Sequence, residues 1–297
     1  MNKIKLMFWD KANFGDALSP YIIEKLSGNK IIKKDLYHGG MFCIRCLYGY
    51  LRRRKFKRLT FATWPWENNL MAIGSILEFA NKKSIVWGSG FMKAESKYTD
   101  VGKILAVRGP LTATRVKELS NIECQTLGDP AILLPVIYQP NQQKRNKIGI
   151  IPHMIETDLF IKNYSFLDKN HFLIIDLRTR NIEYTIKQIT SCRMVLSTSL
   201  HGIIVSHAYG IPAIWIKKNL NDGGFKFADY FMSVGISPYK GFTNIEEILS
   251  NKEYINNFFT ENQDISLPKN NLVDLQKALL KVAPFKLLDK YINFINS

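Results

Sequence analysis

Short runs of aliphatic residues alternate along the chain with longer stretches whose apolar residues recur every three or four positions. The first pattern is typical of buried strands and the second of helices packed on a sheet. Predicted strands cover Ile4–Trp9, Leu70–Ile73, Ser84–Trp87, Ile104–Val107, Lys147–Ile151, Phe172–Asp176, Met194–Ser197 and Ala213–Ile216. Predicted helices cover Pro20–Leu26, Leu111–Leu119, Ile182–Thr190, Gly202–Tyr209 and Lys226–Val234. The alternation predicts an α/β fold built from βαβ units with parallel sheets.

The chain of 297 residues exceeds what one core usually occupies, so we expect two Rossmann-like α/β domains that face a cleft. A polar stretch with a proline, Tyr138 to Asn146, has the composition of a linker between them. The predicted domains are residues 1–143 and 144–297. Apolar residues at helical spacing between Leu272 and Val282 predict a late helix, for which the first domain is a candidate packing partner. Ligands of such domains bind at the carboxyl ends of strands.

Composition and charge narrow the partners. The chain is 46% hydrophobic and 22% charged, as in folded globular proteins, and its formal net charge is +16. Excess positive charge favours anionic partners such as phosphorylated metabolites, acidic lipid surfaces or nucleic acid. The apolar run at the N-terminus is too short for a signal peptide and no apolar stretch is long enough to span a membrane, so we expect a cytoplasmic protein.

Two local features carry weaker signals. Cys43 and Cys46 are spaced like half of a zinc site, but no second pair completes it, so ordinary thiols and no metal are expected. A basic cluster from Arg52 to Arg58 lies within an aromatic segment, residues 47–66, which we interpret as an insertion in the first domain. The cluster fits an anionic membrane surface at the inner face of the membrane, nucleic acid phosphates, or a merely solvated face.

His201 is the strongest candidate for chemistry. It follows the predicted strand Met194–Ser197 and lies at the start of a helix, in the segment Ser199-Leu200-His201-Gly202. A helix N-terminus attracts phosphate or carboxylate groups, and an imidazole there can exchange protons near neutral pH. The alternative is a structural histidine beside Ser199 as helix cap, with His207 further along the helix as a packed or surface residue.

Several other loops that follow predicted strands carry polar or small residues. Asn13 and Asp16 beside a glycine could hold sugar hydroxyls, although the same segment reads as a turn with Ser19 as N-cap and Pro20 at the first helical position. Further candidates are the turns Gly74-Ser75 and Gly88-Ser89-Gly90, the anion-binding side chains Arg108 and Lys226, and His153. A dinucleotide fingerprint is missing, so no NAD or other cofactor is expected.

Taken together, these segments resemble the polysaccharide pyruvyl transferase family. The resemblance runs through Asn13-Phe-Gly-Asp16, Trp87-Gly-Ser-Gly90, Val107-Arg108-Gly, Leu127-Gly-Asp129-Pro-Ala, Ile151-Pro-His153, Ser199-Leu-His201-Gly, Gly210-Ile-Pro and Phe225-Lys226-Phe-Ala-Asp229-Tyr230. It covers most of residues 4 to 235. Each motif is loose, and their common order and spacing carry the specificity.

The resemblance implies a fold like the two-domain GT-B glycosyltransferases, with phosphoenolpyruvate as donor and a sugar of a cell-surface polysaccharide, or its lipid-linked precursor, as acceptor. The product is a pyruvate ketal, with release of phosphate. His201 matches the family's proposed catalytic histidine, and Arg108 resembles a donor-binding residue. Many members carry arginine where this chain has Ser199, and Lys226 is a candidate to replace that charge.

The chemistry of ketal formation assigns roles to these residues. The methylene carbon of phosphoenolpyruvate must gain a proton, for which His201 is the expected acid, while Arg108 and Lys226 hold the anion and the Asn13/Asp16 loop belongs to the acceptor side. Gly88, Ser89, His153, Ser199, Leu200 and Gly202 complete the expected substrate-binding set. Two alternatives stay open: a nucleotide-sugar glycosyltransferase of the same fold, and a non-catalytic protein that binds anions or nucleic acid.

Overall fold

The protein is described by a computed structural model that covers residues 3–36, 44, 47–48, 61–141, 146–217 and 223–297. Within these residues, parallel strands form one sheet in the order β2-β1-β3-β4-β5 and a second in the order β7-β6-β8-β9. The strands are β1 (Lys3–Met7), β2 (Lys30–Lys34), β3 (Asn69–Met71), β4 (Ser84–Trp87), β5 (Lys103–Ala106), β6 (Lys147–Ile151), β7 (Phe172–Ile174), β8 (Cys192–Ser197) and β9 (Ala213–Trp215). The predicted α/β class with parallel sheets is confirmed.

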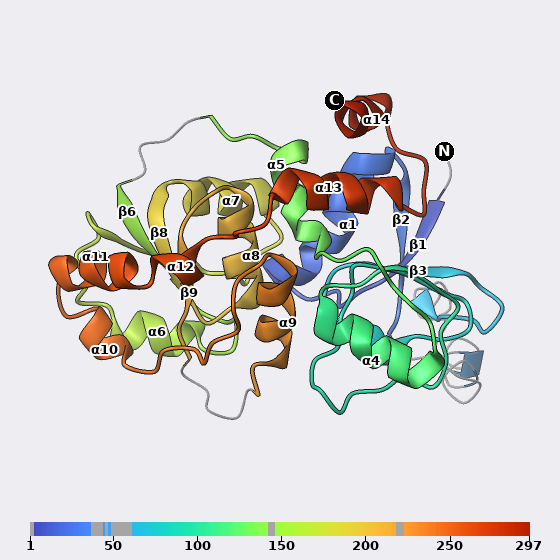
Figure 1. Cartoon of the computed structure of the whole chain (residues 1–297), viewed down its shortest axis with the longest axis horizontal. Coiled ribbons are helices and arrows are strands. Elements are labelled where there is room, and N and C mark those ends of the chain that lie inside the picture. The colour runs from blue at the N-terminus through green and yellow to red at the C-terminus, as the bar shows by residue number, and fades with distance from the viewer. Residues whose placement is uncertain (1–2, 37–43, 45–46, 49–60, 142–145, 218–222) are drawn as a thin grey trace.

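Helices connect and cover the strands, and Figure 1 shows the two sheets toward opposite ends of the long axis with α8 and α9 between them. The helices are α1 (Phe14–Ser27), α4 (Pro110–Ser120), α5 (Leu134–Ile137), α6 (Thr157–Asn163), α7 (Ile182–Thr190), α8 (Leu200–Ala208), α9 (Phe225–Ser233), α10 (Ile245–Ile248), α11 (Lys252–Glu261), α12 (Gln263–Ser266), α13 (Leu272–Lys281) and α14 (Asp289–Asn296), with 3₁₀ turns η1 (Leu77–Phe79) and η2 (Pro130–Leu133).

Both sheets share one topological feature. The first strand of each sheet, β1 or β6, has the second strand on one side and the third on the other. The loop that follows the first strand and the loop that follows the third strand therefore run in opposite directions. A crevice opens between them at the carboxyl ends of these two strands. Each sheet thus provides one crevice, between the loops after β1 and β3 in the first sheet and between those after β6 and β8 in the second.

Helix α1 begins earlier than its sequence pattern predicts. Asn13 is the N-cap, and its side chain accepts a hydrogen bond from the Gly15 backbone at 3.0 Å. Ser19 and Pro20 lie inside the helix, so the interpretation of Ser19 as N-cap is wrong. Ser19 is fully buried, and its hydroxyl instead accepts a hydrogen bond from the backbone of Ile73. The Ser19 hydroxyl, which the sequence predicted to cap the helix, is thus engaged in a tertiary hydrogen bond with Ile73.

All eight predicted strands are present, with ends that differ by up to two residues, and strand β2 was missed. Its sequence, Lys30 to Lys34, is dominated by lysine, which is depleted in strands. The strand forms because it lies at the edge of the sheet and because the ammonium of Lys34 is neutralised inside, 2.6 Å from Glu67. No local pattern announces such a remote partner.

A continuous core of buried apolar side chains joins the two sheets. It contains Leu6 and Trp87 from the first sheet, Val195 from the second, and Leu279 from α13. The indole nitrogen of Trp87 donates to the carbonyl of Leu279 at 2.9 Å, so the C-terminal segment packs on the first sheet. Because the core is shared, the division at 143 and 144 stays a prediction.

Some features of the sequence lie outside the described residues. These are the Cys43 and Cys46 pair, the basic cluster 52–58 and the middle of the predicted linker, 142–145. In the part of the chain that the structure describes, no helix is both long and apolar enough to cross a membrane.

Candidate active site

The crevices of the two sheets open into one common pocket. It has a volume of about 200 Å³, and its walls come from the loops after β1, β3, β6 and β8, with additions from the loops after β4 and β7 and from α9. The lining residues are Trp9, Asn13, Asp16, Gly74, Ser75, Ile76, Met92, His153, Met154, Leu177, Ser199, Leu200, His201 and Lys226. The pocket therefore brings together seven of the residues predicted from the sequence to bind substrate or act in catalysis: Asn13, Asp16, His153, Ser199, Leu200, His201 and Lys226.

His201 lies in the first turn of α8 and its side chain is 18% exposed. The ring packs against the first turn of α1, where a side chain on Gly15 would overlap Nδ1 of His201. Glycine is therefore required at position 15 for the histidine from the second sheet to reach the first helix of the chain. This contact brings the Ser199-Leu-His201-Gly and Asn13-Phe-Gly-Asp16 motifs together.

The surroundings of His201 keep its imidazole neutral. Burial is the main cause that lowers the pKa of His201 to about 3, and the positive charges of Arg108, Lys226 and His153 contribute the rest of this decrease. At neutral pH the ring is therefore neutral before a ligand binds. A bound polyanion would offset these charges and favour the imidazolium, which is the acid form.

Asn13 and Asp16 are fixed to each other at the α1 end of the pocket. The Asn13 amide donates to Asp16 Oδ2 at 2.9 Å and approaches the sulfur of Met154 at 3.3 Å. Burial raises the pKa of Asp16 to about 6, and the hydrogen bond from Asn13 opposes part of that increase. A carboxyl with a pKa near neutrality, held in a pocket, is suited to accept a proton from a hydroxyl.

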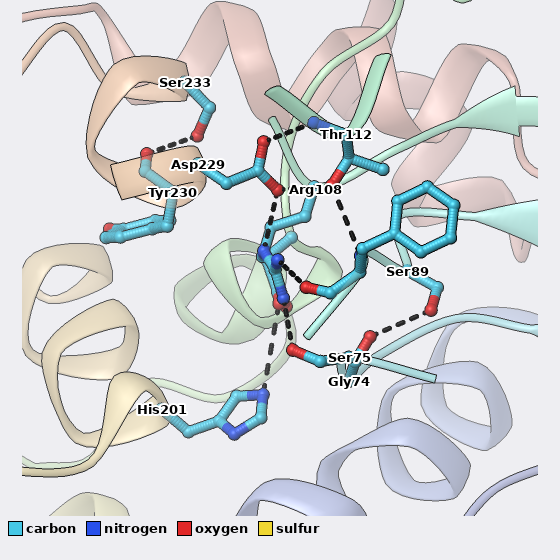
Figure 2. A network of polar contacts seen from close by, with 11 residues as sticks. Gly74, Ser75, Ser89, Arg108, Thr112, His201, Asp229, Tyr230 and Ser233 are labelled. Carbon is cyan, nitrogen blue, oxygen red and sulfur yellow. Dashed lines mark hydrogen bonds and ion pairs between the residues drawn. The ribbon is translucent and has the colours of Figure 1, made fainter. Parts of the chain in front are cut away.

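Arg108 lies behind the pocket wall and is buried, with 1% exposure. Its Nε donates to Asp229 Oδ2 at 3.0 Å, its Nη2 to the Phe91 carbonyl and its Nη1 to the Ser75 hydroxyl, each of the latter at 2.6 Å (Figure 2). Asp229 in turn accepts two hydrogen bonds from Thr112. The Arg108 guanidinium is thus held by protein groups and is not exposed to the pocket.

Ser75 links this buried network to the pocket. Its hydroxyl oxygen accepts the hydrogen bond from Arg108, which leaves the O–H proton to be donated elsewhere, and Ser75 lines the pocket. The neighbouring Ser89 hydroxyl donates to the Gly74 carbonyl at 2.8 Å and so holds the turn that presents Ser75. Arg108 therefore acts on the pocket indirectly, because its hydrogen bond orients the Ser75 hydroxyl that lines the pocket.

Lys226 and Ser199 face the pocket from different elements. Lys226 is in the first turn of α9, with its ammonium 5.4 Å from the centre of the Phe227 ring. Ser199 is the N-cap residue of α8 by position, but its side chain makes no capping hydrogen bond. The structure thus places a cation and the serine in one pocket.

Four of the predicted site residues do not line the pocket. Gly88 and Ser89 form the turn behind Gly74, and Gly202 packs α8 against β6 and β8, where an added Cβ would come within 2.5 Å of Ser197 Oγ. Arg108 is the fourth residue outside the lining. All four shape the wall and so remain candidates for an indirect role in binding.

A wider and more open depression of about 490 Å³ lies near the amino ends of β1 and β3. Its walls include Lys3, Lys5, Trp66 and Glu67. Lys5 and Glu67 already pair with each other at 2.8 Å. Since ligands of parallel sheets bind at the carboxyl ends of strands, the smaller pocket around His201 is the better candidate.

Several pocket residues escaped sequence reasoning. Trp9, Met92 and Leu177 carry no chemical signal, and only their positions after strands could have drawn attention to them. Asp129 is buried beside His201, with its Oδ2 3.9 Å from Nε2 of the ring. Asp129 is part of the Leu127-Gly-Asp129-Pro-Ala motif, which by itself does not indicate a role for the carboxyl group. Among the residues that the structure describes, no three or more His, Cys, Asp or Glu side chains are grouped so that they could hold a metal ion.

The pocket thus gathers a histidine, a lysine and a carboxyl group at the carboxyl ends of two parallel sheets, where ligands of α/β proteins bind. The sequence pattern of the polysaccharide pyruvyl transferase family matches residues 13–217, and the chain belongs to that family. It is also 28% identical over 300 residues to uncharacterized protein L143 of Acanthamoeba polyphaga mimivirus, covering 97% of this chain and 95% of that protein. No solved structure matches significantly.

Proposed function

We propose that this chain transfers pyruvate from phosphoenolpyruvate to two hydroxyls of a sugar, forming a ketal and releasing phosphate. The observation that carries the proposal is the meeting of His201, Lys226 and the Asn13/Asp16 pair in one small pocket of a chain that belongs to the pyruvyl transferase family. A cavity of about 200 Å³ suits a small donor better than a nucleotide sugar, because pockets for drug-sized ligands measure roughly 300 to 1,000 Å³.

Two positive groups support an anionic donor in this pocket. Lys226 provides a direct charge, and Arg108 acts at one remove by orienting the Ser75 hydroxyl toward the ligand. Charge-assisted donors of this kind bind phosphate or carboxylate strongly when water is excluded. Lys226 would thereby supply the charge that the family position of Ser199 lacks in this chain.

His201 is the proposed acid. Phosphoenolpyruvate brings several negative charges beside an imidazole whose pKa is held low by burial and by neighbouring positive charges, so its arrival raises the pKa and loads the ring with a proton. Transfer of that proton to the methylene carbon generates an electrophilic carbon at C2. One sugar hydroxyl adds there and returns its proton to the ring, and the second hydroxyl replaces the phosphate, which carries the last proton away.

The two parallel sheets support a GT-B-like arrangement, with residues 1–143 on the acceptor side and residues 144–297 on the donor side. Each sheet contributes one switch point to the common pocket. Asn13 and Asp16 come from the first part and His201 and Lys226 from the second. The proposed acid and the proposed direct cation thus come from the second part, while the Ser75 hydroxyl that Arg108 orients reaches the donor from the first.

The acceptor is proposed to be a sugar of a cell-surface polysaccharide, such as an exopolysaccharide or capsule, or its lipid-linked precursor. Synthesis of such precursors would place the protein in the cytoplasm, at the inner face of the membrane. Trp66 is 69% exposed and stacked on Trp64, and both follow the basic stretch 52–58 in the sequence. These residues support an anionic membrane surface as an additional partner.

The first test is incubation of the full chain with phosphoenolpyruvate and free or lipid-linked glycans, reading phosphate release and the mass of the ketal. His201→Ala should lower the rate about 10²- to 10⁴-fold, the usual contribution of a general acid. His171→Ala is the matched control, because that histidine is exposed and pairs with Asp168 away from the pocket.

Other outcomes would decide for the alternatives. Near-normal phosphate release by His201→Ala would overturn its assignment as the acid. Binding of nucleotide sugars without binding of phosphoenolpyruvate would favour a glycosyltransferase, and tight nucleic acid binding that weakens steeply with salt would favour a non-catalytic protein.

A further inference from the structure

Asp129 has one oxygen committed to local structure and one that is not. Its side chain is buried, with 1% exposure, directly before the 3₁₀ turn η2. Oδ1 accepts a hydrogen bond from the Ala131 backbone at 2.9 Å and so caps the turn. Oδ2 is buried and has no hydrogen-bond partner in the described structure. An unpaired buried carboxylate oxygen is costly, which calls for an explanation.

The second unpaired atom lies opposite the first. Nε2 of His201 is also buried without a hydrogen bond among the described residues, and it lies 3.9 Å from Asp129 Oδ2. Helix α8 packs directly on η2, so the backbones already hold the two side chains together. A small rotation of the imidazole would shorten the separation to hydrogen-bond distance, as catalytic hydrogen bonds often do when a ligand binds.

We propose that Asp129 is the positioning residue for His201: its Oδ2 accepts the Nε2–H, which makes Nδ1 the nitrogen that exchanges protons with the substrate. Nδ1 is on the edge of the ring that faces Gly15 in α1, and the neighbouring Asn13 and Asp16 line the pocket. The assignment of Nδ1 to substrate chemistry rests on the proposed function. The assignment of the tautomer rests on the geometry alone.

The charges around the pair favour this arrangement at neutral pH. Burial lowers the pKa of His201 to about 3, assisted by Arg108, Lys226 and His153. Burial raises the pKa of Asp129 to about 6, opposed by its backbone hydrogen bond and by Arg108 and reinforced by Asp229. At pH 7 the histidine is therefore neutral and the aspartate ionised, with the Tyr230 hydroxyl nearby un-ionised because burial raises the pKa of that phenol. A neutral imidazole next to a carboxylate turns its N–H toward it.

This pairing has a defined part in the reaction. When the ring gives its Nδ1 proton to the methylene carbon, the imidazole becomes neutral. The other proton stays on Nε2 and keeps its hydrogen bond to Asp129. When the first sugar hydroxyl adds, its proton returns to Nδ1, and Asp129 stabilises the imidazolium that re-forms. Asp129 itself never gains or loses a proton in the cycle.

The test is nitrogen NMR of the histidine rings in the full chain, with the His201 signals identified by their loss in His201→Gln. At pH 7 the wild-type ring should show a protonated Nε2 and an unprotonated Nδ1. Asp129→Asn keeps an oxygen to cap η2 but can present an N–H₂ group to Nε2, which should shift the ring to the Nδ1–H tautomer. An Nδ1–H tautomer in the wild type, or unchanged ring signals in Asp129→Asn, would overturn the proposal.

Kinetics separate positioning from folding. Asp129→Asn should keep the thermal midpoint within a few degrees and the KM for phosphoenolpyruvate within about threefold, while kcat falls about 10²- to 10⁴-fold, as for other orienting carboxylates. An unchanged kcat in a chain that turns over phosphoenolpyruvate would contradict the role. If phosphoenolpyruvate is not turned over at all, the proposed function fails, and the ring signals alone still decide whether Asp129 sets the tautomer.

Discussion

At the scale of single residues, the contact between Gly15 and His201 closely constrains the site. A side chain at position 15 would overlap Nδ1 of the imidazole and approach Cγ and Cε1 of the ring within 3.0 Å. The sequence shows a glycine between Asn13 and Asp16, which is compatible with any turn. Only the fold reveals that the absence of this side chain makes room for a histidine 186 positions further along the chain.

Gly15→Ala should therefore displace His201 while leaving the helix intact, because alanine is a better helix former than glycine. We expect kcat to fall about 100-fold, the loss that a displacement of about 1 Å can cause. Gly223→Ala is the control, since an added Cβ there meets nothing within 4 Å. Equal activity of the two variants would show that the contact is not needed for catalysis.

The identity of a residue predicted the chemistry of its side chain better than it predicted which residues that side chain contacts. The histidine, the lysine and the Asn13/Asp16 pair were chosen for what their side chains can do, and the structure brings them into one pocket. Arg108 was chosen on the same grounds, yet its guanidinium is engaged by Ser75, Phe91 and Asp229. The sequence could not show this, because Asp229 is 121 positions away.

At the scale of elements, the buried ion pair between Arg108 and Asp229 ties the end of β5 to α9. Both side chains are almost completely inaccessible, and Asp229 also binds the first turns of α4 through Thr112. A glycine at position 90 leaves the space that the guanidinium fills. Helix α9 thus carries Lys226 at its start and is anchored to the first half of the chain one turn later.

Asp229→Asn should leave Arg108 as an uncompensated buried charge. Removing one partner of such a pair typically costs about 3 to 5 kcal/mol, so we expect Tm to fall by roughly 6 °C or more. Differential scanning calorimetry measures the change. Glu123→Gln, which removes the partner of Lys117 in an exposed pair, should leave Tm unchanged. A similar Tm for both variants would refute the structural importance of the buried pair.

Elements were predictable where one face or both faces of the segment are apolar. Strands β4 and β6 and helix α7 appear with the predicted bounds. The start of α1 and the strand β2 were not predicted correctly. Ser19, which resembled an N-cap, lies inside α1 and accepts a hydrogen bond from Ile73, and β2 contains a buried lysine paired with Glu67. In both cases a remote contact changes the meaning of a local signal.

At the scale of the whole molecule, buried titratable groups couple stability to pH. His207 is fully buried in α8, where its Nε2 donates to the Ala213 carbonyl and its Nδ1 accepts from the Tyr230 hydroxyl. Burial lowers its pKa to about 4. Below about pH 6.5 the unfolded chain therefore binds a proton here that the folded chain does not, and stability falls as the pH falls.

Burial of Asp16 and Asp129 acts with the opposite sign. Their pKa values rise to about 6, so between pH 6 and 4 the folded chain binds more protons at these carboxyls than the unfolded chain does. Their contribution to stability therefore grows as the pH falls through that range. The buried histidines and the buried aspartates partly cancel, which predicts a shallow pH dependence for the wild type.

His207→Gln should reduce the loss of unfolding free energy that the protein undergoes as the pH falls below about 6.5. Between pH 6 and 5, the slope of the unfolding free energy against pH should become less positive by up to about 1.4 kcal/mol per pH unit. Urea denaturation at several pH values measures it, and His171→Gln is the exposed control. Parallel curves for wild type and His207→Gln would mean that burial does not perturb this histidine.

The sequence by itself determined the class of fold, most of the strands and helices, and the residue types that could perform the chemistry, because hydrophobic periodicity and side-chain reactivity are local properties. The tertiary structure decided which of these residues meet. Two switch points turn toward one pocket, Gly15 admits His201, Asp229 holds Arg108, and Asp129 faces Nε2 of the histidine. These are contacts between segments far apart in the chain, and they depend on how two sheets pack around one core, which no local pattern encodes.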